Sequence, residues 1–172
     1  NVLAGAIEDG LVLDAVIAES QAQAKALWQI REDMPDAQVI SGGGVKHDVS
    51  VPISRIAEFV EVATPLVEKM APQAIVIAFG HLGDGNLHFN VTAPDAASLA
   101  ALLEQESAIN DAVETLAVEM GGSFSAEHGV GRLRLRQMGL YKSEVERDLM
   151  TTLKQALDPA GTLNPGKTVA FG

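Results

Sequence analysis

The sequence predicts an α+β fold, in which helices pack on an antiparallel sheet. Residues 74–79 are apolar and β-branched like a core strand, and a short Gly-rich stretch joins them to a second strand-like segment, residues 86–92. Segments with helical periodicity precede and follow this hairpin. Hydrophobic residues make up 47% of the 172 residues and charged residues 20%, a composition typical of a globular protein. We therefore expect one domain over residues 1–172.

The first part of the chain contains one clear helix. Residues 11–18 are apolar with few breaks, which fits either a buried strand or the start of a helix. Ser20 is a suitable N-cap for a helix that carries Arg31 and ends before Pro35, because a proline disfavours helical geometry in the residue that precedes it. After a run of glycines, residues 45–51 alternate as in a half-buried strand.

Three further segments have the period of helices. In residues 53–70 the apolar positions recur at helical spacing, and Pro65 predicts a kink or a division into two short pieces. A long helix is expected over residues 95–119, with its first residue as the N-cap. The last helix is expected over residues 143–157. Between these two helices, residues 123–131 start as an extended segment and continue as a Gly-punctuated loop.

The hairpin carries two of the four histidines in the chain. The dipeptide Asp84-Gly85 favours a two-residue type I′ turn, which would place His81 directly opposite His88. Directly opposed residues share a face of the sheet, with Cβ atoms about 4.5–5.5 Å apart. Both imidazoles could then reach one metal ion, and Asn90 would point to the same face.

A third metal ligand would come from Glu127 or His128, which are neighbours in the Gly-punctuated loop. Two imidazoles and one carboxylate with open positions suit Zn, Mn or Fe better than Ca or Mg. The spacing along the chain does not by itself bring this loop to the hairpin. Solvated, inert polar residues at a hairpin end are the alternative interpretation.

The charge of the chain excludes some classes of partner. Its 23 acidic and 12 basic residues give a formal net charge of -11, which argues against binding of nucleic acid or of an anionic membrane surface. The absence of cysteine excludes disulfides and thiolate catalysis. We find no apolar run that could span a bilayer and no leader sequence, so a cytoplasmic location is expected. Peripheral membrane association, an organelle and a homodimer are left open.

Five motifs resemble, in the same order, those of the C-terminal domain of FAD-linked oxidases of the vanillyl-alcohol-oxidase type. They are LWQIRE at 27–32, KHDVSVP at 46–52, GHLGDGNLH at 80–88, EHGVG at 127–131 and the turn-rich tail at 158–167. The branch that they resemble is the D-2-hydroxyacid dehydrogenases, which include D-2-hydroxyglutarate and D-lactate dehydrogenases and the glycolate oxidase subunit. The resemblance implies the α+β substrate-side (cap) domain of such an enzyme.

The resemblance also implies roles for individual residues. A divalent metal, Zn or Mn, would be held by His81, His88 and Glu127. The small 2-hydroxyacid substrate would be bound by Arg31, Lys46, Asn90 and His128. By its position in the motif, His128 resembles the base that takes the hydroxyl proton, which suits an imidazole that titrates near pH ~6.5. The guanidinium of Arg31 offers a bidentate fork for a carboxylate, and Lys46 offers a point charge.

Enzymes of this family bind FAD mainly in an N-terminal domain, and we find no counterpart of that domain in the sequence. We therefore expect a fragment of an enzyme that oxidises a D-2-hydroxyacid to the 2-oxoacid with hydride transfer to FAD. Alone, this part should oxidise no substrate. The electron acceptor is not indicated.

Two other functions fit the same residues. A metal-dependent hydrolase would use the same histidines and glutamate to activate water. A binding module without chemistry would recognise a small carboxylate through Arg31 and Lys46 and would need no metal. The sequence also departs from the 2-hydroxyglutarate enzymes at one point, because Pro35 stands where they carry a substrate-contacting Thr. The identity of the 2-hydroxyacid is therefore left open.

Overall fold

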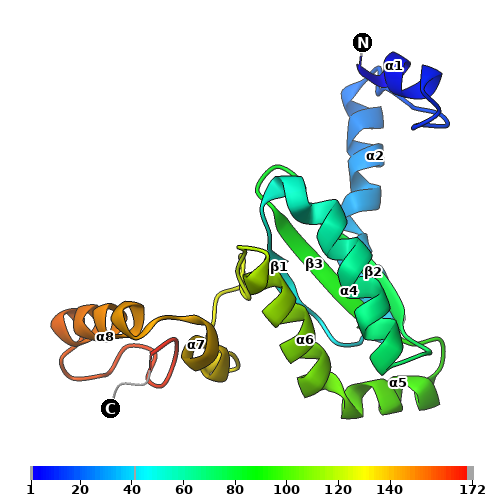
Figure 1. Ribbon diagram of the computed structural model, residues 1–172. Helices are drawn as coiled ribbons and strands as arrows, with labels where there is room; N and C mark the ends of the chain where they lie inside the picture. Colours follow the sequence, from blue (N-terminus) through cyan, green and yellow to red (C-terminus); the bar gives the residue numbers. More distant parts are fainter. Residues whose placement is uncertain (1, 41, 170–172) are drawn as a thin grey trace. The chain divides into compact units, whose positions relative to one another are not determined.

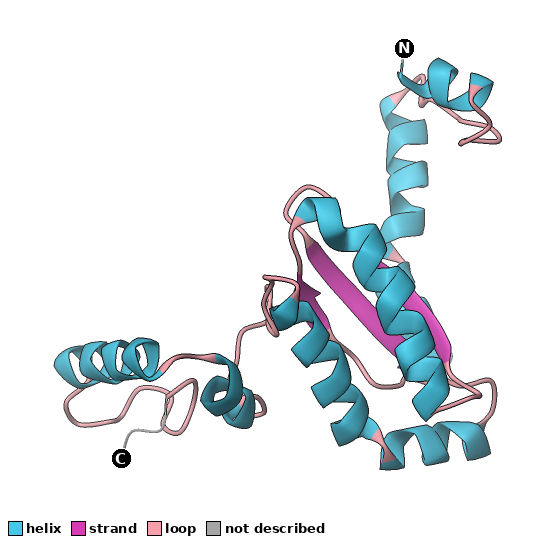
Figure 2. Cartoon of the chain, viewed as in Figure 1, coloured by secondary structure: helices cyan, strands magenta, loops and turns pink. Residues whose placement is uncertain are grey.

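The computed structural model describes residues 2–40 and 42–169, so Asn1, Ser41 and residues 170–172 lie outside the described residues (Figures 1 and 2). The chain divides into two compact units, one within residues 1–43 and one within residues 44–172. The first unit contains the helices α1 (Val2–Glu8), α2 (Gln21–Glu32) and α3 (Met34–Ile40). The second unit contains β1 (Asp48–Ser50), the 3-10 helix η1 (Ile53–Arg55), α4 (Ile56–Met70), β2 (Ile75–His81), β3 (Asn86–Thr92), α5 (Ala96–Glu104), α6 (Glu106–Glu119), α7 (Leu135–Tyr141) and α8 (Glu144–Leu157).

The predicted α+β class with an antiparallel sheet is confirmed. The described strands form one sheet in the order β1-β3-β2, and β3 pairs antiparallel with both neighbours. In Figure 1, helices α4 and α6 lie over one face of this sheet. On that side Phe59 of α4 meets Phe89 of β3 edge to face at 5.7 Å between ring centroids. Phe59, Phe89 and Ile109 are fully buried, so the core lies between the sheet and these two helices.

Strand β3 has the bounds that the alternating pattern predicted. Its apolar residues Leu87, Phe89 and Val91 face the core, and its polar residues therefore lie on the other face. Asn86 and Asn90 of the polar face are buried as well, because β3 is the central strand and has a neighbour on each side. The main chain that carries the polar face is thus held by hydrogen bonds to a strand on each side.

The apolar segment 11–18 is neither a strand nor the start of a helix. Most of its side chains are open to solvent, with Leu11 80% and Leu13 98% exposed. A strand needs a partner for its backbone groups, and the described residues of the first unit include none in a strand. The expected helix after it is confirmed, because the Oγ of Ser20 accepts the main-chain N–H of Gln23 at 3.2 Å and α2 ends at Glu32.

The segment interpreted as a core strand, β2, lies at the edge of the described sheet. None of its residues is fully buried, and Ile75 is 44% exposed. A continuous apolar run does not reveal how many neighbours a strand has, so the prediction of a strand was right and its placement in the core was wrong.

The helices differ from the prediction in number and in bounds. Residues 95–119 form two helices that meet at Gln105, although Asp95 caps the first by accepting the N–H groups of Ala97 and Ser98. Pro65 lies inside α4 without dividing it into two pieces. The helices α1, α3 and α7 were not predicted, and α3 has Pro35 in its first turn, where a proline is tolerated. Helix α8 agrees with the expected last helix. In the described part of the chain, no helix combines the length and the apolar character needed to cross a membrane.

Candidate functional site

The hairpin has a different register from the predicted one. His81 pairs with Asn86, and His88 pairs with Phe79 instead of with His81. A type I′ turn requires positive φ at both central residues, and Asp84 does not have it. Residues 82–85 connect the two strands instead of a two-residue turn. The main-chain N–H groups of Asp84 and Gly85 both bond back to the carbonyl of His81.

The functional consequence of the predicted register survives this correction. A shift of two residues keeps each side chain on its face, whereas a shift of one would invert the faces. His81 and His88 therefore lie diagonally on one face, with ring centroids 6.3 Å apart. Asn90 lies on the same face, two residues after His88.

Strand β1 brings the loop of Glu127 to this hairpin. Ser123 forms an isolated bridge with Ser50, with main-chain hydrogen bonds of 3.0 and 2.9 Å. The N–H of Ala126 then bonds to the carbonyl of Asp48 at 3.0 Å. Since β1 also pairs with β3 at His88, the loop reaches the histidine face from the opposite side to β2.

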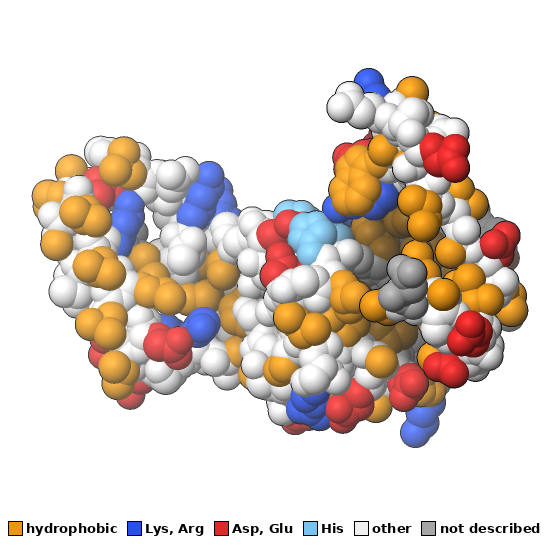
Figure 3. All heavy atoms as spheres, turned by 90° about the horizontal axis from the view of Figure 1, so that it is seen from above, with side chains coloured by type: hydrophobic (Ala, Val, Ile, Leu, Met, Phe, Trp, Pro, Cys, Tyr) orange, Lys and Arg blue, Asp and Glu red, His pale blue; other side chains and the backbone are white. Residues whose placement is uncertain are grey.

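The carboxylate of Glu127 lies between three imidazoles. Its Oε1 is 2.9 Å from Nε2 of His88 and 3.7 Å from Nε2 of His128, and its Oε2 is 3.9 Å from Nδ1 of His81. His88 is the most buried of the three histidines, with 15% of its side chain exposed. Figure 3 shows the histidine side chains at the surface next to acidic side chains. The carboxylate of Glu127 therefore lies near all three of these imidazoles.

These residues fit a divalent transition metal. Ligand atoms of His88, Glu127 and His128 lie within 4.8 Å of one another, which is close enough for one ion. The set predicted from the sequence shares His88 and Glu127 with this cluster and takes His81 in place of His128. Imidazole nitrogen with carboxylate oxygen is a donor set for Zn, Mn or Fe. Each of the two sets keeps coordination positions open for a substrate.

Asp48 is a buried acid beside this cluster that the sequence reasoning did not assign. Its side chain is 5% exposed, and its Oδ2 lies 3.6 Å from Nδ1 of His128. Burial acts to raise the pKa of Asp48, but hydrogen bonds from the His128 N–H, the Asn86 amide and the Glu127 N–H outweigh it and lower the pKa below 3.8. Asp48 is therefore an anion at neutral pH. Asp48 alternates with the core residue Val49 and pairs directly with His88, so its side chain lies on the polar face of the sheet.

The substrate-binding residues predicted from the family resemblance lie in both units. Arg31 belongs to α2 of the first unit, where it forms an ion pair with Glu32 at 3.2 Å and lies over the Trp28 ring at 5.8 Å. Lys46 is exposed just before β1 in the second unit. The second unit thus brings together the hairpin and loop residues of the predicted site, and Arg31 is described only within its own unit.

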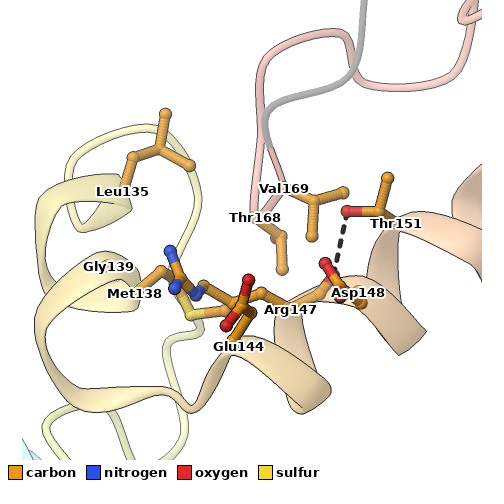
Figure 4. Close-up of a pocket in the computed structure, with 9 residues that line it drawn as sticks. All are labelled: Leu135, Met138, Gly139, Glu144, Arg147, Asp148, Thr151, Thr168 and Val169. Carbon is orange, nitrogen blue, oxygen red and sulfur yellow. Dashed lines mark hydrogen bonds between the residues drawn. The ribbon is translucent and has the colours of Figure 1, made fainter.

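Two cavities in the second unit differ in their distance from the histidine cluster. One, of about 410 Å³, opens beside the cluster and is lined by Ser50, Asp84, Asn86, Ser123, Ser125, Ala126 and Glu127. The other, of about 360 Å³, lies between α7, α8 and the segment that follows (Figure 4). Its walls are Leu135, Met138, Gly139, Glu144, Arg147, Asp148, Thr151, Thr168 and Val169. The first cavity contains the carboxylate of Glu127, a candidate metal ligand, and is the one that could hold a substrate next to it.

Comparison with known proteins places these features in a family. The family described as FAD linked oxidases, C-terminal domain, matches residues 1–168. The chain is 40% identical over 170 residues to a mitochondrial D-2-hydroxyglutarate dehydrogenase of Rattus norvegicus, covering 98% of this chain and 30% of that protein. It is 39% identical over 161 residues to the D-2-hydroxyglutarate dehydrogenase of Xanthomonas citri pv. viticola, covering 94% of this chain and 34% of the relative.

A third relative, the D-2-hydroxyglutarate dehydrogenase of Stutzerimonas stutzeri, is 34% identical over 164 residues, covering 95% of this chain and 35% of that protein. The chain thus spans about a third of the length of the curated relatives that it matches. The names of the rat and Arabidopsis thaliana relatives place those two proteins in mitochondria, so the comparisons do not single out the cytoplasm that the sequence predicted.

Proposed function

Since the chain belongs to the FAD-linked oxidases through their C-terminal domain, we propose that it is the metal- and substrate-binding part of a flavin-dependent D-2-hydroxyacid dehydrogenase. The observation that carries this proposal is the Glu127 carboxylate between three imidazoles on the polar side of the hairpin. The names of the matched relatives make D-2-hydroxyglutarate the first substrate to test. We assign the flavin to a part of the polypeptide outside these residues.

The reaction removes two hydrogens from the substrate, so that a 2-hydroxyacid becomes a 2-oxoacid. The hydroxyl proton goes to a base, for which we propose His128, and the α-hydrogen leaves with its electron pair as hydride. A bound flavin supplies the hydride acceptor, and a bound divalent metal makes the substrate hydroxyl more acidic. Arg31 and Lys46 would hold the substrate carboxylates, and Asn90 would donate a hydrogen bond from the hairpin face.

We assign the metal to His81, His88 and Glu127 and keep His128 as the base. The position of Asp48 supports this choice, because a carboxylate 3.6 Å from Nδ1 of His128 favours the tautomer with the proton on that nitrogen. The Nε2 of His128 is then free to accept a proton from the substrate. His81 approaches Glu127 from the other side, at the end of β2.

Matched histidine variants test this assignment. Zn²⁺ is titrated into the wild-type chain and into the variants His88→Ala, His81→Ala and His128→Ala. The wild-type chain should bind one ion. Affinity should be lost in His88→Ala and His81→Ala, because two ligands hold the ion far less well than three, and it should be nearly unchanged in His128→Ala. The reverse order of the His81 and His128 variants would exchange their roles. Acid should weaken binding, because a protonated imidazole is not a ligand.

A second titration separates the proposal from the two other functions. D-2-hydroxyglutarate, with the L-enantiomer as the control, is titrated against the chain with and without Mn²⁺, and the binding is followed by isothermal titration calorimetry. The proposed function predicts D-selective binding that needs the ion. Equal binding without the ion would favour a simple carboxylate-binding module, and an absence of binding would contradict the substrate role of this chain.

A further inference from the structure

The loop of Glu127 and His128 has little packing of its own. The side chains of these two residues are 40% and 68% exposed. Two glycines with positive φ, Gly129 at 74° and Gly131 at 55°, follow directly and allow many backbone conformations. The orientation of a ligand and a base in this loop must therefore come from hydrogen bonds that fix the main chain.

Those hydrogen bonds converge on one carboxylate. The Oδ2 of Asp48 accepts the main-chain N–H of Glu127 at 3.0 Å and that of His128 at 2.7 Å. The main-chain carbonyl of the same aspartate accepts the N–H of Ala126 at 3.0 Å. Three successive residues of the loop are thus bonded to one residue of β1.

The same carboxylate is itself held in place from the hairpin. Its Oδ1 accepts the side-chain amide of Asn86 at 2.8 Å, and Asn86 is the first residue of β3 and is 5% exposed. Hydrogen bonds to a carboxylate are roughly twice as strong as those between neutral groups. Asp48 and Asn86 are both buried and lie on the paired strands β1 and β3. These contacts therefore fix the position of the loop relative to β3, the strand that carries His88.

We propose that Asp48 is a positioning residue, which fixes the backbone of Glu127 and His128 so that their side chains face His88. This inference rests on the proposed function for its consequence, because the positioned residues are the metal ligand and the base. The near-parallel stacking of the His88 and His128 rings, at 5.4 Å and 22°, is the arrangement that this backbone position allows. Asp48 is not among the metal ligands that we propose; it acts through the main chain of the loop and through the ring of His128.

The test compares the wild-type chain with the variants Asp48→Ala, Asp48→Asn and Val67→Ala. Asparagine retains a carbonyl oxygen for the two N–H groups, and the Asn86 amide can turn to accept from the new NH₂, since its own Oδ1 has no hydrogen-bond partner in the structure. Val67 of α4 is fully buried in the hydrophobic core and has no hydrogen bond to the loop, so Val67→Ala controls for a general loss of stability.

Two readouts are measured in each variant, the amide hydrogen exchange of Glu127 and His128 and the affinity for Zn²⁺. In Asp48→Ala both amides should exchange faster and the Zn²⁺ affinity should fall about 10–100-fold, the usual effect of removing a group that orients a metal ligand. Asp48→Asn should recover most of the amide protection and of the affinity. Val67→Ala should leave both readouts close to the wild type.

The outcomes separate this inference from the proposed function. If the wild-type chain binds no Zn²⁺, the metal role fails, while the amide exchange still decides whether Asp48 holds the loop. Wild-type exchange and affinity in Asp48→Ala would overturn the positioning role on its own. The same loss in Val67→Ala, or no recovery in Asp48→Asn, would also overturn it, because the effect would then not depend on the hydrogen-bond acceptor.

Discussion

The sheet with its two covering helices and the C-terminal helix α8 are stabilised in different ways. Phe59, Phe89 and Ile109 are fully buried between the sheet and helices α4 and α6. In the described part of the chain no residue of α8 is buried, although its apolar residues recur at every fourth position. These residues are between 59% and 80% exposed, and they are Val145, Leu149, Leu153 and Leu157.

Local interactions take the place of a core in α8. Ser143 and Glu146 form a capping box, and Lys142 pairs with Glu146 at 3.0 Å. At the other end Lys154 pairs with Asp158, whose carboxylate also accepts the N–H groups that follow the helix. The candidate metal site is built on the region with long-range packing, because a site must be held more rigidly than local capping allows.

The largest expected effect comes from removing a core ring. Phe89→Ala should lower the free energy of unfolding by about 3–5 kcal/mol, because it leaves a cavity in a fully buried position. Leu149→Ala is the matched control on α8 and should change the stability of the sheet by less than about 0.5 kcal/mol. Urea denaturation, followed by far-UV circular dichroism, measures the free energy of unfolding of both variants. Equal losses would show that α8 shares the core of the sheet.

A somewhat smaller effect is expected from the buried ion pair between Arg134 and Glu114. Glu114 is fully buried on α6, so Arg134→Ala would leave an uncompensated carboxylate and should cost about 3 kcal/mol in the free energy of unfolding. Arg136→Ala breaks a pair with Asp111 at the surface of the same helix and is the control, for which little change is expected. Similar values for the two variants in denaturant titrations would contradict the difference in burial.

The core also predicts a dependence of stability on pH. Burial lowers the pKa of His47 from 6.5 to about 4, the hydrogen bond to the Phe89 carbonyl opposes this shift, and the nearby Arg134 charge adds to it. Between these pKa values the unfolded chain takes up a proton that the folded chain does not, so stability should fall by roughly 3 kcal/mol as the pH drops from 7 to 4. His47→Gln should remove this part of the pH slope. An unchanged slope would show that His47 does not titrate between the two states.

The smallest effect should come from the cap of α8. Ser143→Ala removes the acceptor for the N–H of Glu146 and should destabilise the helix by about 1 kcal/mol. Amide hydrogen exchange should rise about 5-fold within α8, following from that free energy, and should stay unchanged in β3. A parallel rise in β3 would mean that the two regions unfold together.

Patterns that depend on neighbouring residues were predictable from the sequence. The alternation of residues 86–92 gave the bounds of β3 and the polar face with His88, and the caps at Ser20 and Asp95 fixed the starts of two helices. The face shared by His81 and His88 was also correct, since a register shift of two residues preserves it.

Features that depend on long-range contacts were not predictable. The edge position of β2 follows from having one neighbouring strand in the described sheet. The hairpin register is a local feature, but it follows from a turn that the dipeptide Asp84-Gly85 does not determine alone. The approach of Glu127 to the hairpin needs the bridge between Ser50 and Ser123 and the hydrogen bonds of Asp48, which join residues far apart in the chain. Sequence spacing carries no trace of such contacts.

The most direct test of the proposed site is anomalous X-ray diffraction from crystals of the chain loaded with Zn²⁺, measured at the zinc absorption edge. The account predicts one anomalous peak per chain, about 2.0–2.2 Å from Nε2 of His88 and from a carboxylate oxygen of Glu127, with His81 as the third ligand. An ion bound away from Glu127, or no ion in the loaded crystals, would contradict it.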